Sequence, residues 1–113
     1  MKLDRHAEIS ESKLTQYLLE QRPQNDKSGF FALAGYTRNN WQQLEADLRQ
    51  QILPRDAELS RQTPYGDLYT ITGALRGPNR EVVQIVSVWL VQPGGGTRLV
   101  TVYPERRQRS NGL

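Results

Sequence analysis

The 113-residue sequence lacks cysteine and contains a single histidine, His6. Without cysteine the chain forms neither a disulfide nor a thiolate metal site, which fits a reducing compartment. A zinc site needs about four nitrogen, sulfur or oxygen ligands, and Asp56, Glu58 and Asp67 are not spaced like an oxygen-ligand loop. The sequence therefore predicts no metal and no cofactor.

Hydrophobic runs long enough to cross a membrane are also missing. The longest one, from Val82 to Val91, is interrupted by Gln84 and Ser87, so no segment reaches the roughly 18 apolar residues of a transmembrane helix. Residues 1–9 are charged and lack an apolar stretch, and we expect no secretory signal there. These features predict a soluble chain in the cytoplasm, with no membrane partner.

The length predicts one domain, because a single core typically takes about 100–150 residues. We expect a polar lead-in at residues 1–11, one α+β domain at 12–104 and a basic flexible tail at 105–113. The net charge is +3 and the isoelectric point about 9.5. Much of the positive excess lies in the tail, in Arg106, Arg107 and Arg109. Net charge therefore does not by itself predict a nucleic-acid-binding domain.

Helical apolar spacing marks the first half of the chain. Ser10 or Ser12 is a suitable cap for a first helix, which Pro23 ends. Asp26 suits the start of a second helix over 27–34. Thr37 or Asn39 suits the start of a third, which ends at Pro54. The apolar side chains that we expect these helices to bury are Leu14, Tyr17, Leu18, Phe30, Phe31, Leu33, Trp41, Leu44, Leu48 and Ile52.

Beyond residue 56 the apolar pattern changes to a period of two. It predicts strands over 57–62, 68–75, 81–91 and 97–103, the first of them a short edge strand. Adjacent strands on short loops pair antiparallel. The predicted fold class is α+β, with about three N-terminal helices packed on a three- to four-stranded antiparallel meander sheet.

The strand at 81–91 is apolar on both faces. One set of alternating residues is Val83, Ile85, Trp89 and Val91, and the other is Val82, Val86, Val88 and Leu90. The pattern is typical of a central strand that is covered on two sides. Helices can cover one side. The other side requires a curved sheet, a partner subunit or a ligand.

Common catalytic signatures are missing. The glycines at 94–96 join two strands, which predicts a hairpin turn, since phosphate loops lead into a helix. His6 lies in the charged lead-in, where a solvated side chain is expected. No Gly-x-Ser-x-Gly elbow occurs. The remaining possibility is metal-free phosphodiester cleavage, which needs a cation, an acid or base, and a hydroxyl near the oxyanion.

Side chains suited to that chemistry occur along the strands. The hydroxyls are Tyr65, Tyr69, Thr72, Ser87, Thr101 and Tyr103, and the cations are Lys27, Arg61 and Arg98. Arginine suits phosphate binding. A purely structural interpretation is open as well, because tyrosine and threonine favour strands. Trp41 and Trp89 sit at core positions of the pattern, whereas stacking on a base would require exposure.

A set of short motifs supports a family resemblance. The motifs are Asp26-Lys27-Ser28-Gly29-Phe30-Phe31, Gly35-Tyr36, Asn40-Trp41-x-x-Leu44, Thr63-Pro64-Tyr65-Gly66-x-x-Tyr69, Val88-Trp89 and Leu99-Val100-Thr101-x-Tyr103-Pro104. Over residues 9–104 they resemble a family of short, functionally uncharacterised bacterial domains related to polymorphic-toxin modules. Helices followed by a strand meander are also similar, in fold, to metal-free ribonucleases of the barnase, EndoU and RelE type.

This resemblance implies a toxin-like, ribonuclease-like role. It points to Lys27, Tyr65, Tyr69, Thr101 and Tyr103 as catalytic positions, with Arg61 and Arg98 available to bind phosphate. The chain departs from the usual site in having no histidine in the body of the domain. The alternative is a non-enzymatic interaction domain, such as the small protein partner in a two-gene toxin/antitoxin-like module or a homodimer.

Overall fold

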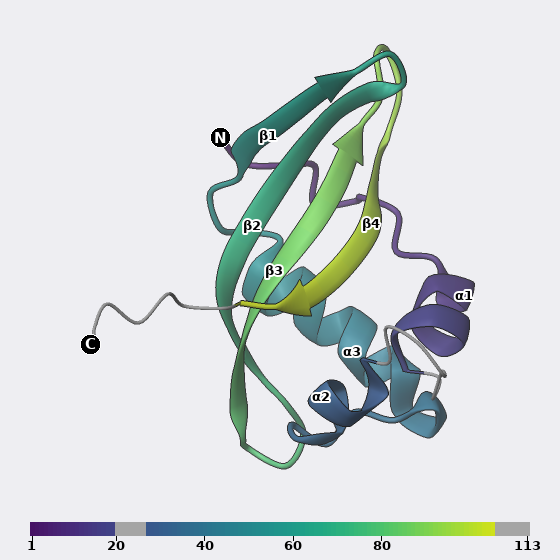
Figure 1. Cartoon of the computed structure of the whole chain (residues 1–113), viewed down its shortest axis with the longest axis vertical. Helices are drawn as coiled ribbons and strands as arrows, with labels where there is room; N and C mark the ends of the chain where they lie inside the picture. The colour runs from purple at the N-terminus through teal and green to yellow at the C-terminus, as the bar shows by residue number, and fades with distance from the viewer. Residues whose placement is uncertain (20–26, 106–113) are drawn as a thin grey trace.

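The computed structural model describes residues 1–19 and 27–105. The expected helix cap Asp26, the helix-ending Pro23 and the arginines of the tail lie outside the described residues. Within them the chain is α+β, as predicted, and every helical segment precedes the sheet in sequence (Figure 1).

The helical segments are short and lie between Glu11 and Ile52. They are α1 (Glu11–Lys13), which continues into a wider π-type turn, η1 (Leu14–Leu18), then α2 (Ser28–Ala32), a 3-10 turn, η2 (Arg38–Asn40), and α3 (Trp41–Asp47), which continues into a second π-type turn, η3 (Leu48–Ile52). Two expected caps are present. The Ser10 hydroxyl accepts a bond from the Lys13 amide, and Thr37 forms a reciprocal capping box with Asn40. The helical segments are thus shorter than the three expected helices, and two of them, α1 and η2, begin at an expected cap.

Four strands form one antiparallel sheet in the order β1-β2-β3-β4. They are β1 (Glu58–Thr63), β2 (Gly66–Arg76), β3 (Val82–Val91) and β4 (Thr97–Pro104). Each strand pairs with the next through a short connection. The antiparallel meander and the edge position of β1 confirm the sequence prediction.

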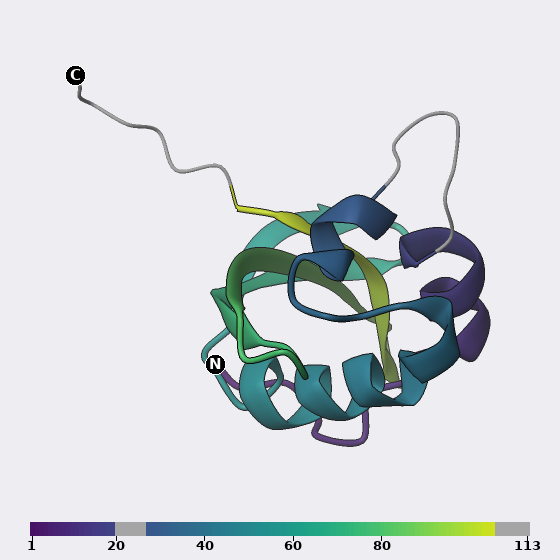
Figure 2. The same cartoon turned by 90° about the horizontal axis from the view of Figure 1, so that it is seen from below.

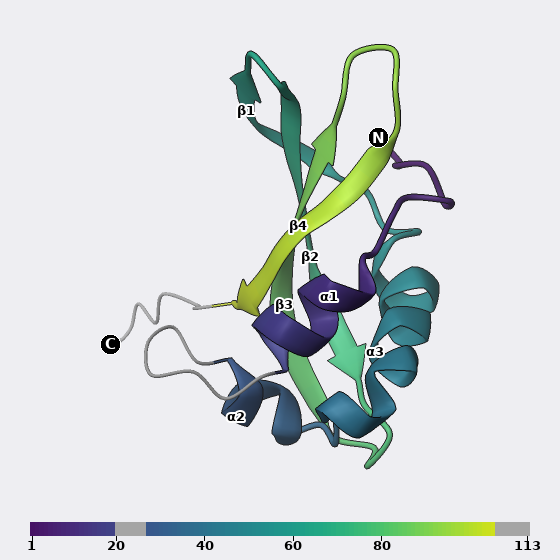
Figure 3. The same ribbon diagram turned by 90° about the vertical axis from the view of Figure 1, so that its right-hand side faces the viewer.

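One face of the sheet carries the hydrophobic core. Figures 2 and 3 show α3 lying along this face, with α1 beside β4. The largest fully buried side chains come from both layers: Trp89, Tyr36, Phe31, Leu14, Leu18, Leu44, Leu48, Ile52, Leu53, Ile71, Leu75 and Ile85. Trp41 is partly buried against this cluster. Among the described residues, no helix is both long and apolar enough to cross a membrane.

Strand β3 alternates between the two faces as its sequence predicts. Ile85 and Trp89 are fully buried on the helix-covered face. Val86 and Val88 point the other way and are half-buried, although no described helix covers that face. Leu90, also on that face, is only 7% exposed and is not part of the main core cluster. Leu90 is thus buried on a face of the sheet that no described helix covers.

The first ten residues form no regular helix, but they pack onto the domain. Leu3, Ala7 and Ile9 belong to the core cluster. Glu8 forms a parallel bridge with Arg98, in which the Glu8 amide donates to the Thr97 carbonyl at 2.8 Å and the Leu99 amide donates to the Glu8 carbonyl at 2.9 Å. This segment therefore covers the edge of β4 at its start.

Candidate functional site

The sheet face opposite the helices, here called the open face, collects most of the candidate side chains. Cross-strand partners point to the same face of a sheet. The register joins Arg61 to Leu68, Leu68 to Leu90, and Leu90 to Arg98. This row crosses all four strands and begins and ends with an arginine.

A second row runs parallel to the first. Glu58 pairs with Thr70, Thr70 with Val88, and Val88 with Thr101. A bulge in β4 places members of both rows on the same face of the sheet. It arises because Val88 pairs with Thr101 while the next residue of β3 pairs with Leu99. The extra residue, Val100, allows Arg98 and Thr101 to share the open face although they are three positions apart.

Lys27 meets the second row at the edge of β4. Its Nζ donates a hydrogen bond to Thr101 Oγ1 at 2.9 Å. The same Nζ lies 5.1 Å from the centre of the Tyr17 ring, and Lys13 Nζ lies 5.2 Å from that ring. Both lysines therefore make cation–π contacts with one tyrosine.

This environment changes the acidity of Lys27. Partial burial lowers the pKa of its ammonium below the ordinary 10.5, the charge of Tyr17 acts in the opposite direction, and the positive charge of Lys13 lowers the pKa further. A larger fraction of Lys27 is therefore neutral near physiological pH than for a solvated lysine, and a neutral amine accepts protons.

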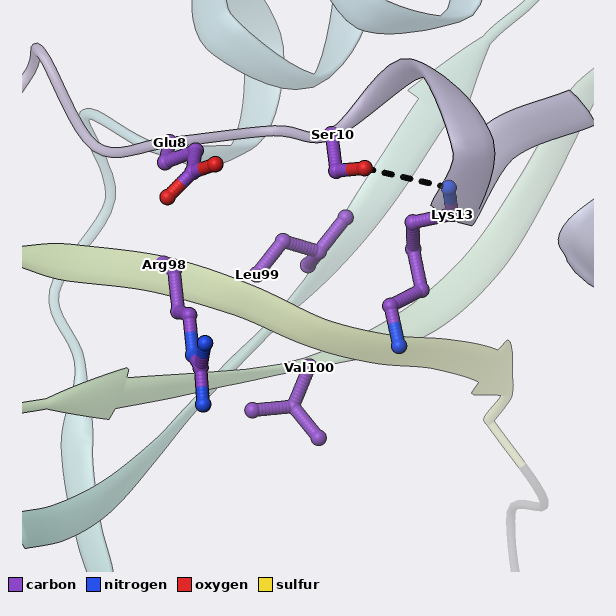
Figure 4. Close-up of a pocket in the computed structure, with 6 residues that line it drawn as sticks. All are labelled: Glu8, Ser10, Lys13, Arg98, Leu99 and Val100. Carbon is purple, nitrogen blue, oxygen red and sulfur yellow. Dashed lines mark hydrogen bonds between the residues drawn. The ribbon is translucent and has the colours of Figure 1, made fainter. Parts of the chain in front are cut away.

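Two hollows lie beside β4, and Arg98 and Val100 line both of them. The first has a volume of about 360 Å³ and is lined by Glu8, Ser10, Lys13, Arg98, Leu99 and Val100. Figure 4 shows the Arg98 side chain leaving β4 on the side away from Glu8, with Val100 between Arg98 and Lys13. The second, of about 520 Å³, lies on the open face and shares Arg98 and Val100 with the first. Arg98 is thus a wall common to both hollows.

The described residues contain no group of three or more histidine, cysteine, aspartate or glutamate side chains placed to hold a metal ion. His6 is exposed in the N-terminal segment. Glu58 lies on the open face at the β1 end of the second row, whereas the polar groups at the β4 end are the Lys27 amine, the Arg98 guanidinium group and the Thr101 hydroxyl. This set binds anions and moves protons.

A family model described as a domain of unknown function (DUF6883) matches residues 2–106. The chain belongs to this family. No curated protein and no solved structure matches it. Membership in DUF6883 carries no evidence for a relation to toxin modules or for a ribonuclease fold.

The DUF6883 fold brings several of the predicted site residues together. Lys27 and Thr101 are in direct contact. Arg61, Tyr65 and Arg98 line the larger hollow. Tyr103 pairs with Val86 on the open face and lines a separate hollow of about 410 Å³ with Val86, Pro104 and Glu105.

Tyr69 is the exception among these residues. It pairs with Trp89 on the helix-covered face and packs against the core cluster. Of the other strand hydroxyls, Ser87 is fully buried and its Oγ accepts a bond from Trp89 Nε1 at 2.8 Å. These two residues are placed away from the amines and arginines of the open face.

Sequence reasoning missed the contribution of Lys13 and Tyr17. Tyr17 was assigned only to the apolar stripe of the first helix, and it does pack partly against the core. Lys13 and Tyr17 are four positions apart, a spacing that places side chains on the same side of a helix. The four-residue spacing in the sequence thus indicates that the Lys13 and Tyr17 side chains lie together.

Proposed function

We propose that this domain acts on RNA and cleaves its phosphodiester backbone without a metal, with the open face beside β4 as the active surface. The observation that carries the proposal is the 2.9 Å contact between Lys27 Nζ and Thr101 Oγ1, close to the hollow that Lys13 and Arg98 line. An RNA substrate implies action in the cytoplasm and suits a toxin-like module.

In the proposed reaction the ribose 2′-hydroxyl attacks the adjacent phosphorus. Neutral Lys27 takes the 2′-hydroxyl proton, and its lowered pKa favours that role. Thr101 is a positioning residue that holds the amine. Lys13 and Arg98 bind the phosphate oxygens, on which negative charge develops.

The leaving group needs a proton. Tyr103 lies two residues beyond Thr101 on the same strand, which separates their backbones by about 7 Å, and it is 40% exposed on the open face. We assign its hydroxyl the role of proton donor. The bond from phosphorus to the 5′ oxygen breaks as the bond to the 2′ oxygen forms. The products are a 2′,3′-cyclic phosphate and a 5′-hydroxyl.

The test is cleavage in EDTA of a DNA strand that contains one ribonucleotide, with an all-DNA strand as reference. We expect a single cut at the ribonucleotide and a cyclic phosphate end, detected by mass spectrometry. Lys27→Gln should lower the rate about 100-fold or more, the smallest effect typical of a lost general base. Lys2→Gln, which changes an exposed lysine next to Asp56, should leave it unchanged. Intact substrate after incubation with excess protein would sink the enzymatic proposal.

A non-enzymatic interaction domain is the second candidate. It is supported by the half-buried apolar side chains of the open face, among them Ala74, Val86 and Val88, and by Val82, which is 51% exposed. A small protein partner or a second copy of the chain would cover them. Light scattering that finds a strict monomer, together with no complex with neighbouring gene products, would contradict this candidate.

A further inference from the structure

The larger hollow on the open face has the composition of a binding groove. Nine of the described residues line it, and six of them define what is here called the arginine groove: Arg61, Tyr65, Leu68, Leu90, Arg98 and Val100. Its volume of about 520 Å³ is within the range of about 300–1,000 Å³ that is common for ligand sites. No acidic side chain lines it among the described residues.

The floor of the arginine groove is apolar. Leu68 and Leu90 are cross-strand partners at its centre, and Leu90 is only 7% exposed. Leu90 lies outside the main core cluster and is one of the residues that line the groove. An apolar floor favours a ligand with a flat hydrophobic surface.

The walls of the groove are positively charged. Arg61 and Arg98 are the outer members of the row that crosses the sheet, and neighbouring strands are about 4.8 Å apart, which places their backbones about 14 Å from each other. Within the described part of the chain, neither guanidinium group forms an ion pair or a side-chain hydrogen bond. Two guanidinium groups without partners, on either side of an apolar floor, favour an anionic ligand.

An aromatic ring stands at one end of the groove. Tyr65 is 76% exposed, but its turn is held firmly. The Tyr65 amide donates to Thr63 Oγ1 at 3.1 Å, and that hydroxyl donates to the Gly66 carbonyl at 2.7 Å. Gly66 has a φ of +139°, and an added Cβ there would lie 2.5 Å from the Val91 carbonyl oxygen. The fold thus presents an exposed ring on a constrained turn, which lowers the entropy cost of stacking.

We infer that the arginine groove is a subsite for single-stranded RNA, in which Tyr65 stacks on a base above the leucine floor while Arg61 and Arg98 bind the flanking phosphates. Aromatic stacking combined with a cationic track is how single strands are commonly bound. An acidic peptide would satisfy the arginines and leave the ring without a partner. The inference rests on the proposed action on RNA and extends it, because Arg98 and Val100 connect this subsite to the hollow beside Lys13.

The test is binding of a short fluorescent RNA with 2′-O-methyl groups, which cannot undergo attack by its 2′ oxygen, measured by anisotropy in EDTA. Tyr65→Ala should weaken binding about five-fold or more, and Tyr65→Phe should retain it because the ring remains. Arg61→Gln and Arg98→Gln should each reduce the slope of log affinity against log salt by about 0.7. Arg38→Gln is the matched control, since Arg38 is exposed in η2 and does not line the groove.

The outcomes separate the two proposals. Binding that depends on Arg61 and Tyr65, without any cleavage of RNA, would support the subsite and sink the cleavage reaction. If Arg61→Gln and Tyr65→Ala both cleave RNA with the KM of the wild type, the subsite is overturned and the cleavage proposal stands. Equal competition by a polyglutamate peptide, with no effect of Tyr65→Ala, would also overturn the subsite, because the groove would then be a general anion surface.

Discussion

Lys27 has an environment that makes its titration visible in the stability of the protein. Burial and the nearby Lys13 lower its pKa below 10.5 in the folded chain, against the opposing effect of Tyr17. The unfolded chain keeps the ordinary value. When the pH rises between the two pKa values, the unfolded chain binds more protons, so the free energy of unfolding increases with pH in that window.

We therefore expect the wild type to gain stability relative to Lys27→Met as the pH rises from 7 towards 9.5. Urea unfolding of both proteins across this range measures the difference and cancels the titration of shared groups. Arg38→Met, which removes an exposed positive charge in η2, should give a curve parallel to the wild type. If the difference in the free energy of unfolding between wild type and Lys27→Met stays constant across this pH range, the pKa of Lys27 is not lowered in the folded chain.

At this scale the sequence identifies residue types better than contacts. The sequence predicts Lys27 as a cation and Thr101 as a hydroxyl of the site, but they are 74 positions apart, and only the fold brings them together. Tyr69 and Tyr103 carry the same chemical group, and the sequence predicts the same role for both. The pairing register places one against Trp89 and the other against Val86, on opposite faces. A difference of face depends on strand register, which residue type does not reveal.

The junction between α3 and the sheet depends on a small polar network. The Tyr36 hydroxyl lies 2.6 Å from Asp47 Oδ2 and 3.2 Å from the Arg76 carbonyl oxygen, and Gln43 Nε2 donates to Asp47 Oδ1 at 2.9 Å. Asp47 is 7% exposed. Burial first, and then the hydrogen bond to Asp47, raise the pKa of Tyr36, so its hydroxyl stays protonated as a donor.

Tyr36→Phe removes that donor and leaves the buried Asp47 carboxylate with fewer partners. We expect the free energy of unfolding to fall by about 1–3 kcal/mol, the usual penalty for an unsatisfied buried group. Urea unfolding measures it. Tyr65→Phe is the matched control, because it removes a hydroxyl from a side chain that is 76% exposed and should change stability by less than about 0.5 kcal/mol. Equal losses in the two variants would contradict a special role for Asp47.

Strands were predicted more closely than helices, for a physical reason. The strand segments are rich in β-branched and aromatic residues and are separated by short turn signals, such as Pro64 with Gly66 and the glycines at 94–96, and this combination favours strands in hairpins. The helical stripe through Leu44, Leu48 and Ile52 is compatible with either an α-helix or a wider turn, and the chain adopts the wider turn at Leu48–Ile52. The bulge at Val100 in β4 also left no mark in the alternation, although the open face depends on it.

On the scale of the whole molecule, a single core joins three parts of the chain that are distant in sequence. Ile9 from the N-terminal segment, Leu48 from the helical region and Trp89 from the sheet belong to one buried cluster. The open face lies on the other side of the sheet. Surface substitutions there, at Tyr65 or Arg61, therefore test function with little effect on folding.

This arrangement makes a specific prediction about residues 1–11, for which the sequence predicts a polar lead-in. Ile9 is 6% exposed within the core, so Ile9→Ala should lower the free energy of unfolding by about 2–5 kcal/mol. Leu59→Ala, at a side chain that is 52% exposed, should cost less than about 1 kcal/mol. Because one core is shared, Ile9→Ala should shift a single unfolding transition monitored by the fluorescence of Trp41 and Trp89.

Hydrogen exchange distinguishes this result from local fraying. The Leu99 amide donates to the Glu8 carbonyl at 2.9 Å, so its protection reports directly on the N-terminal segment. If that segment folds with the domain, Leu99 exchanges through the same global opening as the central amides of β3, and Ile9→Ala reduces the protection of both equally. If the segment opens independently, Leu99 loses protection while the β3 amides keep theirs. That second outcome would support the predicted lead-in at residues 1–11 and confine the cooperative domain to the helices and the sheet.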